Sequence, residues 1–230
     1  YGTFYRLSMI MTIFIQAFRY AAEPLFFDQA DQKDAKVAYV AIMNWFVFAC
    51  GFIFLITSLF SDEIAHLLIK QSTYFDHPDA LTIVPILLLA NLFLGIFYNL
   101  SIWYKLSNKT MAGAWITLFG ALITILINYL AIPHFGYMAS AWATFFCYGS
   151  MMVVSYFWGQ QVYPVPYATK KLIAYFIISL LIYGINNLVH LVSSNQPFNY
   201  LFASILLFAF IVFVVRIEKK DLQSIFRKSN

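Results

Sequence analysis

The sequence predicts an all-α protein, a polytopic transmembrane helical bundle of about seven spans, from three observations. Of its 230 residues, 62% are hydrophobic and only 10% are charged, whereas a soluble domain needs many more charged residues to cover its surface. The apolar residues form runs of 18 or more, which is the length that crosses a bilayer as a helix. These runs are continuous and do not alternate with polar residues, as the strands of a membrane barrel would.

The expected spans are residues 4–27, 37–60, 81–104, 111–132, 137–158, 170–192 and 199–216. Residues 61–70 are too short to cross, and their acidic start and apolar remainder predict a helix at the membrane surface. Only four residues, 133–136, separate the fourth and fifth spans, so these two are expected to form an antiparallel hairpin. Pro24, which has no amide hydrogen to donate, is expected to end or kink the first span.

The first span carries polar side chains in an otherwise apolar run. Gln16, Arg19 and Glu23 recur at helical spacing and therefore project from one face. Arg19 lies on the order of 13 Å from the polar end at Asp28, close to the middle of a hydrocarbon core about 30 Å thick. An arginine at that depth must face protein, water or an anionic ligand. Two interpretations remain open: an internal Arg19–Glu23 pair that locks the helix, and the charged lining of a transport cavity.

The third span carries a second polar stripe. Asn91, Gly95 and Asn99 recur every four residues and share one face. Amides inside membranes bind neighbouring helices or line a cavity, and both uses stay open for Asn91 and Asn99.

Other candidate ligands have simpler explanations. Asp76, His77 and Asp79 could hold a metal ion, but acidic residues at the start of a helix are explained by its dipole. Cys50 and Cys147 lie in apolar runs and are expected to be buried as small hydrophobic residues without a disulfide. No metal and no cofactor is therefore expected.

The basic residues predict the orientation. Eleven of the fourteen Lys and Arg residues fall at one end of the predicted spans, which marks that end as cytoplasmic. They are Lys33, Lys36, Lys105, Lys109, Lys170, Lys171, Arg216, Lys219, Lys220, Arg227 and Lys228. The C-terminus is then cytoplasmic and Tyr1 lies outside. Because the basic residues are distributed by membrane side, the net charge of +4 does not indicate a nucleic-acid partner. The tail from Arg216 to Asn230 suits an anionic lipid surface.

Three segments together resemble bacterial polysaccharide-biosynthesis flippases of the O-antigen type. They are residues 16–24 (QAFRYAAEP), 84–91 (VPILLLAN) and 132–144 (IPHFGYMASAWAT). These flippases belong to the multidrug/oligosaccharidyl-lipid/polysaccharide (MOP) superfamily, whose members have twelve or fourteen spans in two lobes around a central cavity. The resemblance implies that the seven spans are the last seven of fourteen, with the N-terminal lobe as their partner. Residues 1–158 would be five spans of the C-terminal lobe, and residues 159–230 an extra helix pair with a basic cytoplasmic tail.

The resemblance implies a multi-pass protein of the bacterial inner membrane that is a transporter and not an enzyme. Its substrate would be a lipid-linked oligosaccharide, carried by an isoprenoid diphosphate and moved from the cytoplasmic to the outer leaflet. Arg19, Gln16 and the two amides would replace the water around the sugar and the diphosphate. The extra helix pair would offer a groove for the lipid tail. Glu23 would take up a coupling proton or balance Arg19.

Two other functions are weighed against this one. A multidrug and toxin extrusion type exporter would place acidic residues opposite cationic drugs, and Glu23 is the one clear acid within a span. A membrane-embedded polymerase or acyltransferase would need clustered acids and histidines at a membrane face, for which only Asp76, His77 and Asp79 are available.

Overall fold

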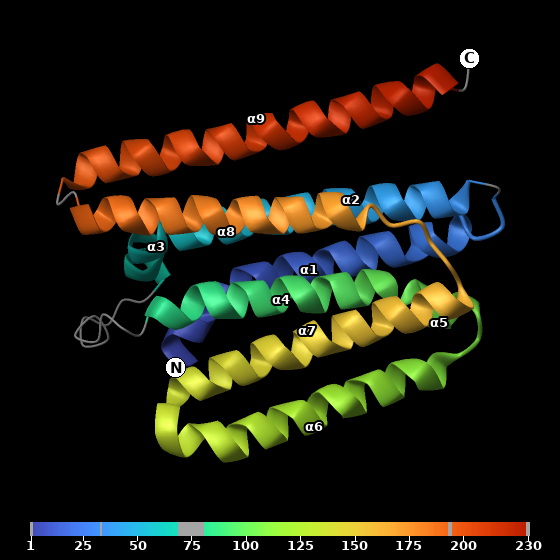
Figure 1. Ribbon diagram of the computed structural model, residues 1–230, viewed down its shortest axis with the longest axis horizontal. Helices are drawn as coiled ribbons and strands as arrows, with labels where there is room; N and C mark the ends of the chain where they lie inside the picture. The colour runs from blue at the N-terminus through green and yellow to red at the C-terminus, as the bar shows by residue number, and fades with distance from the viewer. Residues whose placement is uncertain (1, 33, 69–80, 193–194, 229–230) are drawn as a thin grey trace.

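A computed structural model describes residues 2–32, 34–68, 81–192 and 195–228, and in these residues the regular structure is helical. The helices are α1 (Gly2–Asp28), α2 (Ala35–Leu59), α3 (Ser61–Leu68), α4 (Ile83–Leu100), α5 (Ile102–Leu106), α6 (Thr110–Phe135), α7 (Tyr137–Val162), α8 (Thr169–Val192) and α9 (Gln196–Lys228). The long helices lie side by side along one direction (Figure 1). The predicted all-α polytopic bundle is confirmed.

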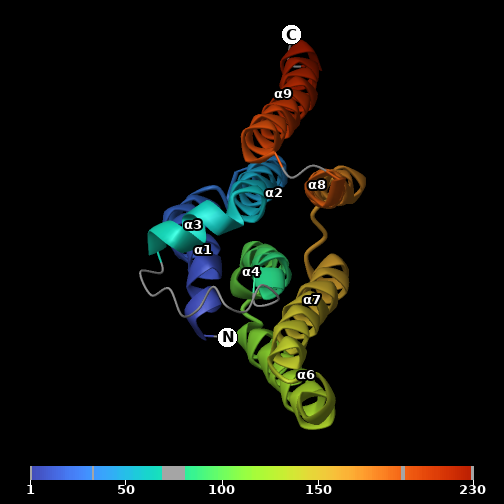
Figure 2. The same ribbon diagram turned by 90° about the vertical axis from the view of Figure 1, so that its left-hand side faces the viewer.

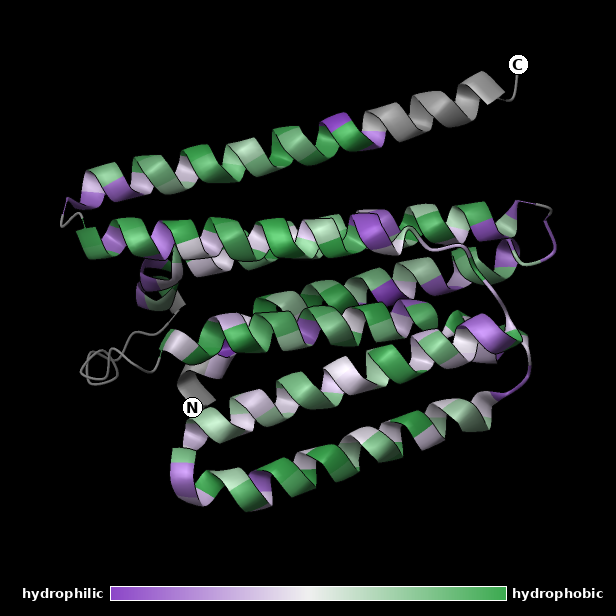
Figure 3. Ribbon diagram, in the orientation of Figure 1, coloured by the Kyte–Doolittle hydropathy of each residue, from purple (hydrophilic) through white to green (hydrophobic). Residues whose placement is uncertain are grey.

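Within the described residues, six segments are long and apolar enough to cross a membrane: Ala35–Leu59, Ile83–Leu106, Thr110–Phe135, Tyr137–Val162, Thr169–Val192 and Gln196–Glu218. The expected first span is not among them. Its helix α1 has 27 residues, enough for a bilayer at about 1.5 Å per residue, but polar side chains such as Arg19 and Glu23 lower its hydropathy. Figure 3 shows hydrophilic residues gathering at the helix ends and interrupting the second half of α1.

Helix α4 lies at the centre of the bundle. It packs against α1, α2 and α7, while α6 contacts α7 and α8 contacts α2. Viewed along the helices, α6 and α9 form the two outer extremes (Figure 2). The short helix α3 packs on α1 and α2, and its Glu63 carboxylate accepts a hydrogen bond from the Tyr200 hydroxyl of α9.

The buried face of α1 explains how this helix joins the bundle. Leu7, Met11 and Ile15 recur every four residues and are almost completely buried. Phe46 of α2 fits over Gly95 of α4, where an added Cβ would lie 2.2 Å from the ring. Arg19 and Glu23 continue α1 beyond this apolar contact, at the end where α4 gives way to α5.

Helix α8 docks on α2 through residues that alternate three and four apart, the spacing of a coiled-coil seam. The buried set is Asn44, Val47, Gly51, Phe54 and Ser58 on α2, with Tyr175, Ser179, Ile182 and Asn186 on α8. Asn186, near the C-terminal end of α8, is buried like the other members of this set.

Two prolines do not end their helices. Pro24 lies inside α1, which continues to Asp28, and Pro133 lies inside α6, which continues to Phe135. A proline removes one helical hydrogen bond. Around Pro24 the buried side chains of Ala22 and Phe26 hold the helix in place, whereas the turns around Pro133 are mostly exposed. Because α6 continues past Pro133, the α6–α7 connection is shorter than expected. It is Gly136 alone, with φ 55° and ψ −137°, a conformation that favours glycine.

The predicted hairpin of α6 and α7 is present, and Ser140 of α7 donates a hydrogen bond to Asn128 of α6 at 3.2 Å. Cys50 and Cys147 are buried and free, as predicted. The acidic cluster at Asp76, His77 and Asp79 lies outside the described residues.

The α8–α9 pair is joined by a buried ionic contact. The Glu218 carboxylate accepts a hydrogen bond from the Tyr175 hydroxyl at 2.8 Å and forms an ion pair with Lys171 at 2.7 Å. Both charged side chains are mostly buried, with 7% and 14% of their surfaces exposed. This contact fixes the register of α9 against α8. The division of the chain at residue 158 stays a prediction.

Candidate functional site

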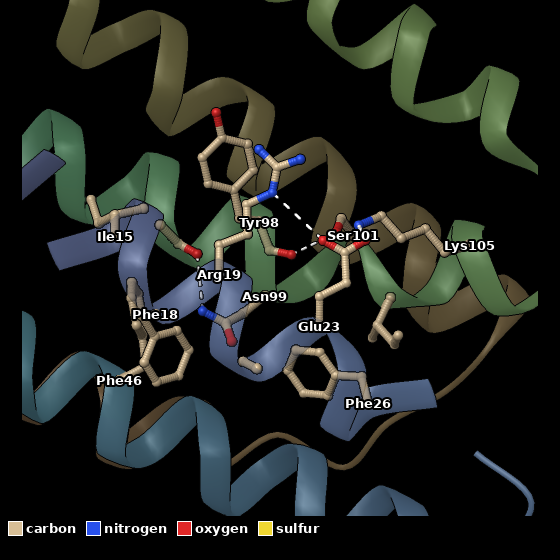
Figure 4. Close-up of a pocket in the computed structure, with 13 residues that line it drawn as sticks. Ile15, Phe18, Arg19, Glu23, Phe26, Phe46, Tyr98, Asn99, Ser101 and Lys105 are labelled. Atoms are coloured by element: carbon tan, nitrogen blue, oxygen red, sulfur yellow. Dashed lines mark hydrogen bonds and ion pairs between the residues drawn. The ribbon is translucent and has the colours of Figure 1, made fainter. Parts of the chain in front are cut away.

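A polar pocket lies where the second half of α1 meets α2, α4 and α5 (Figure 4). Its lining is Ile15, Phe18, Arg19, Ala22, Glu23, Phe26, Phe46, Gly95, Tyr98, Asn99, Ser101, Ile102 and Lys105. The α1 members are spaced three and four apart, so they share one face of the helix. Apolar and aromatic side chains form the wall toward α2, and the charged groups lie together beside α5.

One carboxylate in this pocket lies between two cations. Glu23 Oε1 is 2.6 Å from Lys105 Nζ, and Glu23 Oε2 is 3.8 Å from Arg19 Nε. The expected Arg19–Glu23 contact therefore exists, but it is the longer of the two. The closer partner, Lys105, comes from 82 residues further along the chain.

The guanidinium of Arg19 lies over the ring of Tyr98, 4.8 Å from its centroid. A cation on an aromatic face is stabilised by the ring quadrupole without being neutralised. The Arg19 side chain is 39% exposed, so its charge remains available from the open side of the pocket.

The two asparagines of the α4 stripe have different surroundings. Asn99 lines the pocket and donates from Nδ2 to the Gly95 carbonyl at 3.1 Å. Its Oδ1 is buried and has no hydrogen-bond partner among the described residues. Asn91 is also buried, but its Nδ2 donates to the Ser8 carbonyl of α1 at 3.3 Å. Asn91 thus joins two helices away from the pocket.

The structure therefore brings together Arg19, Glu23 and Asn99, while Gln16 and Asn91 are not part of the lining. Gln16 is half-buried.

Sequence reasoning missed Tyr98 and Ser101, and it used Lys105 only as one of the basic residues that predict the orientation. A usable signal was present, because these three are spaced three and four apart. They therefore continue one helical face toward the basic end.

The enclosed part of this pocket is small. Its volume is about 20 Å³, which suits one water molecule. A larger ligand can reach Arg19 only from the open side of the pocket.

A second, larger hollow lies between α7 and α8, with α2 and α4 as its floor. It has a volume of about 580 Å³, within the range of ligand-binding clefts. Its lining is almost wholly apolar: Met43, Val47, Leu92, Phe93, Ile96, Leu100, Met152, Val153, Tyr156, Phe157, Tyr167, Thr169, Leu172, Ile173, Phe176 and Ile177. We name it the apolar groove. Burial raises the pKa of Tyr167, in the connector between α7 and α8, so its hydroxyl stays neutral.

Comparison with known proteins gives one family match. The MatE family matches residues 1–130, which cover α1 to α5 and most of α6, and so include the whole polar pocket. No curated protein and no solved structure matches the chain. A helical bundle with six candidate spans agrees with the family match, and the chain belongs to the MatE family.

Proposed function

We propose that this chain works as part of a flippase that moves an oligosaccharide, linked to an isoprenoid diphosphate, to the outer leaflet of a bacterial inner membrane. Members of the MatE family are transporters rather than enzymes, and the substrate is our inference from the site. The proposal depends on one observation, the excess positive charge of the polar pocket.

In that pocket two cations, Arg19 and Lys105, face one carboxylate, Glu23. A sugar diphosphate cannot enter hydrocarbon unaided, because burying ionised groups without partners is prohibitive. A guanidinium offers a phosphate two parallel hydrogen bonds. The unpartnered Oδ1 of Asn99 would accept from a sugar hydroxyl or a water beside it. These groups support binding of an anionic, hydroxyl-rich head.

The apolar groove supports the lipid half of the substrate. It is formed by α8 together with α2, α4 and α7. Its apolar lining suits an isoprenoid chain, whose burial is favourable at about 25 cal/mol per Å². The polar pocket and the apolar groove both adjoin α4, so one molecule could place its head and its chain on the same helix.

Charge also supports an orientation. The described basic residues Lys36, Lys105, Lys109, Lys170 and Lys171 lie at the end where α2, α6 and α8 begin. That end would be cytoplasmic by the positive-inside rule, and the polar pocket lies near it. Substrate would then enter from the cytoplasmic leaflet, and rocking against an N-terminal lobe would expose it outside.

The alternative within the same family is a multidrug and toxin extrusion exporter, which the family match fits equally well. An exporter of organic cations needs a carboxylate that is free to meet them. Glu23 already has two cationic partners, and this favours the anionic substrate.

Arg19→Ala tests the proposal in cells that depend on this protein for surface polysaccharide. Surface glycan should fall about tenfold or more, since charge-assisted hydrogen bonds are worth about 1.5–3 kcal/mol. Arg6→Ala is the matched control, because it removes the same charge from an exposed position of the same helix and should leave the glycan unchanged.

Membrane levels of both variants are measured by immunoblot. Normal surface glycan in Arg19→Ala, or a gain in susceptibility to cationic drugs with no change in glycan, would contradict the proposed substrate.

A further inference from the structure

Helix α5 is only five residues long, but its side chains are held from two sides. Trp103 donates from Nε1 to Ser155 Oγ of α7 at 3.1 Å and lies against Gly159, where an added Cβ would be 2.7 Å from the ring. Tyr104 lies against Gly113 of α6, where an added Cβ would be 2.9 Å from the ring. Two aromatic residues packed against two glycines therefore fix α5 on the hairpin of α6 and α7.

The side chain that follows Trp103 and Tyr104 in α5 points to another helix. Lys105 reaches α1 and pairs with Glu23 at 2.6 Å, and 24% of its side chain is exposed. Since Trp103 and Tyr104 are held by α7 and α6, packing outside the polar pocket places the Lys105 backbone within reach of Glu23.

This placement decides how charge is shared in the pocket. Glu23 is four residues from Arg19 on α1, a spacing at which an arginine and a glutamate usually pair. Here their contact is 3.8 Å, longer than the 2.6 Å contact to Lys105. The Arg19 guanidinium also lies over the ring of Tyr98. The pair of Glu23 and Lys105 is neutral, and the remaining positive charge belongs to Arg19.

We propose that Lys105 is a positioning residue for the anion site. By pairing with Glu23 at 2.6 Å, it keeps that carboxylate 3.8 Å from Arg19 Nε, so the guanidinium is only partly neutralised and can bind a phosphate group. The inference rests on the function proposed above, and it assigns the diphosphate end of the substrate to Arg19. Removal of Lys105 turns Glu23 toward Arg19, and the net charge of the site falls from positive to zero.

The test uses farnesyl diphosphate as the probe and measures its affinity for the protein in lipid nanodiscs. Lys105→Met should weaken binding about tenfold, because Glu23 becomes the partner of Arg19. Glu23→Gln should tighten binding about threefold, because it removes the competing negative charge. The double variant Lys105→Met with Glu23→Gln should return to within about twofold of the parent, because Arg19 again has no competitor.

A structural ion pair would give another pattern, since either single variant breaks it. Equal weakening by Lys105→Met and Glu23→Gln would therefore overturn the inference. A double variant as weak as Lys105→Met would also overturn it, because Lys105 would then touch the phosphate itself. Melting temperatures of all three variants show whether each still folds.

The inference and the proposed function fail in different ways. Farnesyl diphosphate binding that is lost in Arg19→Met but unaffected by Lys105→Met would reject the role of Lys105 and keep the anion site. Normal surface glycan in Arg19→Ala cells would reject the proposed function, whatever the nanodisc measurements show.

Discussion

Asn91 and Asn99 lie two turns apart on one face of α4, and the surroundings of their amides differ. Asn91 gives its Nδ2 hydrogen to the Ser8 carbonyl of α1, whereas the Oδ1 of Asn99 lies unpartnered in the polar pocket. Both side chains are 5% exposed, so burial alone does not separate them. The two residues differ in their hydrogen bonds, and this difference predicts opposite effects when each asparagine is replaced by leucine.

Asn91→Leu should lower the free energy of unfolding by about 1 kcal/mol, the usual value of a hydrogen bond between helices in a membrane. Surface glycan should stay at the parental level, because Asn91 is outside the pocket. Asn99→Leu should have the reverse effect, with unfolding almost unchanged and glycan lowered severalfold. Thermal unfolding in detergent and glycan staining measure the two quantities. Loss of glycan in Asn91→Leu at normal stability would place Asn91 in the transport path.

At the scale of the element, the packing of α5 against α6 and α7 places Lys105 beside the polar pocket. The break after α4 lies at Ser101, whose hydroxyl donates to the Tyr98 carbonyl at 2.6 Å. Beyond it, Trp103 and Tyr104 meet glycines on α7 and α6. Gly159 is therefore needed because an aromatic ring occupies the space of its missing side chain.

Gly159→Ala should destabilise the protein by about 1–3 kcal/mol, because its Cβ overlaps the Trp103 ring and overpacking costs that much. Gly149→Ala is the matched control on the same helix. There the added Cβ would lie 3.4 Å from Phe93, an ordinary contact, and alanine favours the helix by up to about 1 kcal/mol. Thermal unfolding followed by tryptophan fluorescence measures both. Equal melting temperatures would show that Trp103 moves freely and that α5 is not fixed by α7.

Composition predicted the helices well, since apolar runs in a chain of 10% charged residues leave few other structures in a membrane. The ends of the helices were predicted less well, because a proline does not always end a helix: α1 continues past Pro24, where neighbouring side chains are buried, and α6 continues past Pro133. The sequence predicted only part of the polar pocket. Arg19 and Glu23 could be predicted because charged residues are conspicuous in an apolar helix. The contact of Glu23 with Lys105 could not, because the two residues are 82 positions apart in the chain. No local spacing encodes it, because it depends on which faces of α1 and α5 meet.

At the scale of the whole molecule, α4 joins the two features that the proposed function uses. The polar pocket lies on its α1 side, and the apolar groove lies between α7 and α8. The α8–α9 pair is held together by the buried contact of Glu218 with Lys171 and Tyr175, and both of its helices pack against α2. Both features adjoin the same helix, which is the arrangement that the proposed function needs for a substrate with a charged head and a lipid chain.

The most direct measurement is lipid translocation by the reconstituted flippase, that is, this chain together with the N-terminal lobe of the proposed function. Liposomes would carry a fluorescent farnesyl-diphosphate sugar, and a membrane-impermeant reductant would bleach only the lipid in the outer leaflet. The anion site predicts that the protected inner half is bleached at least tenfold faster than in protein-free liposomes, and that Arg19→Met restores the protein-free rate. Translocation at the protein-free rate with the parent protein, or equally fast translocation with Arg19→Met, would contradict it.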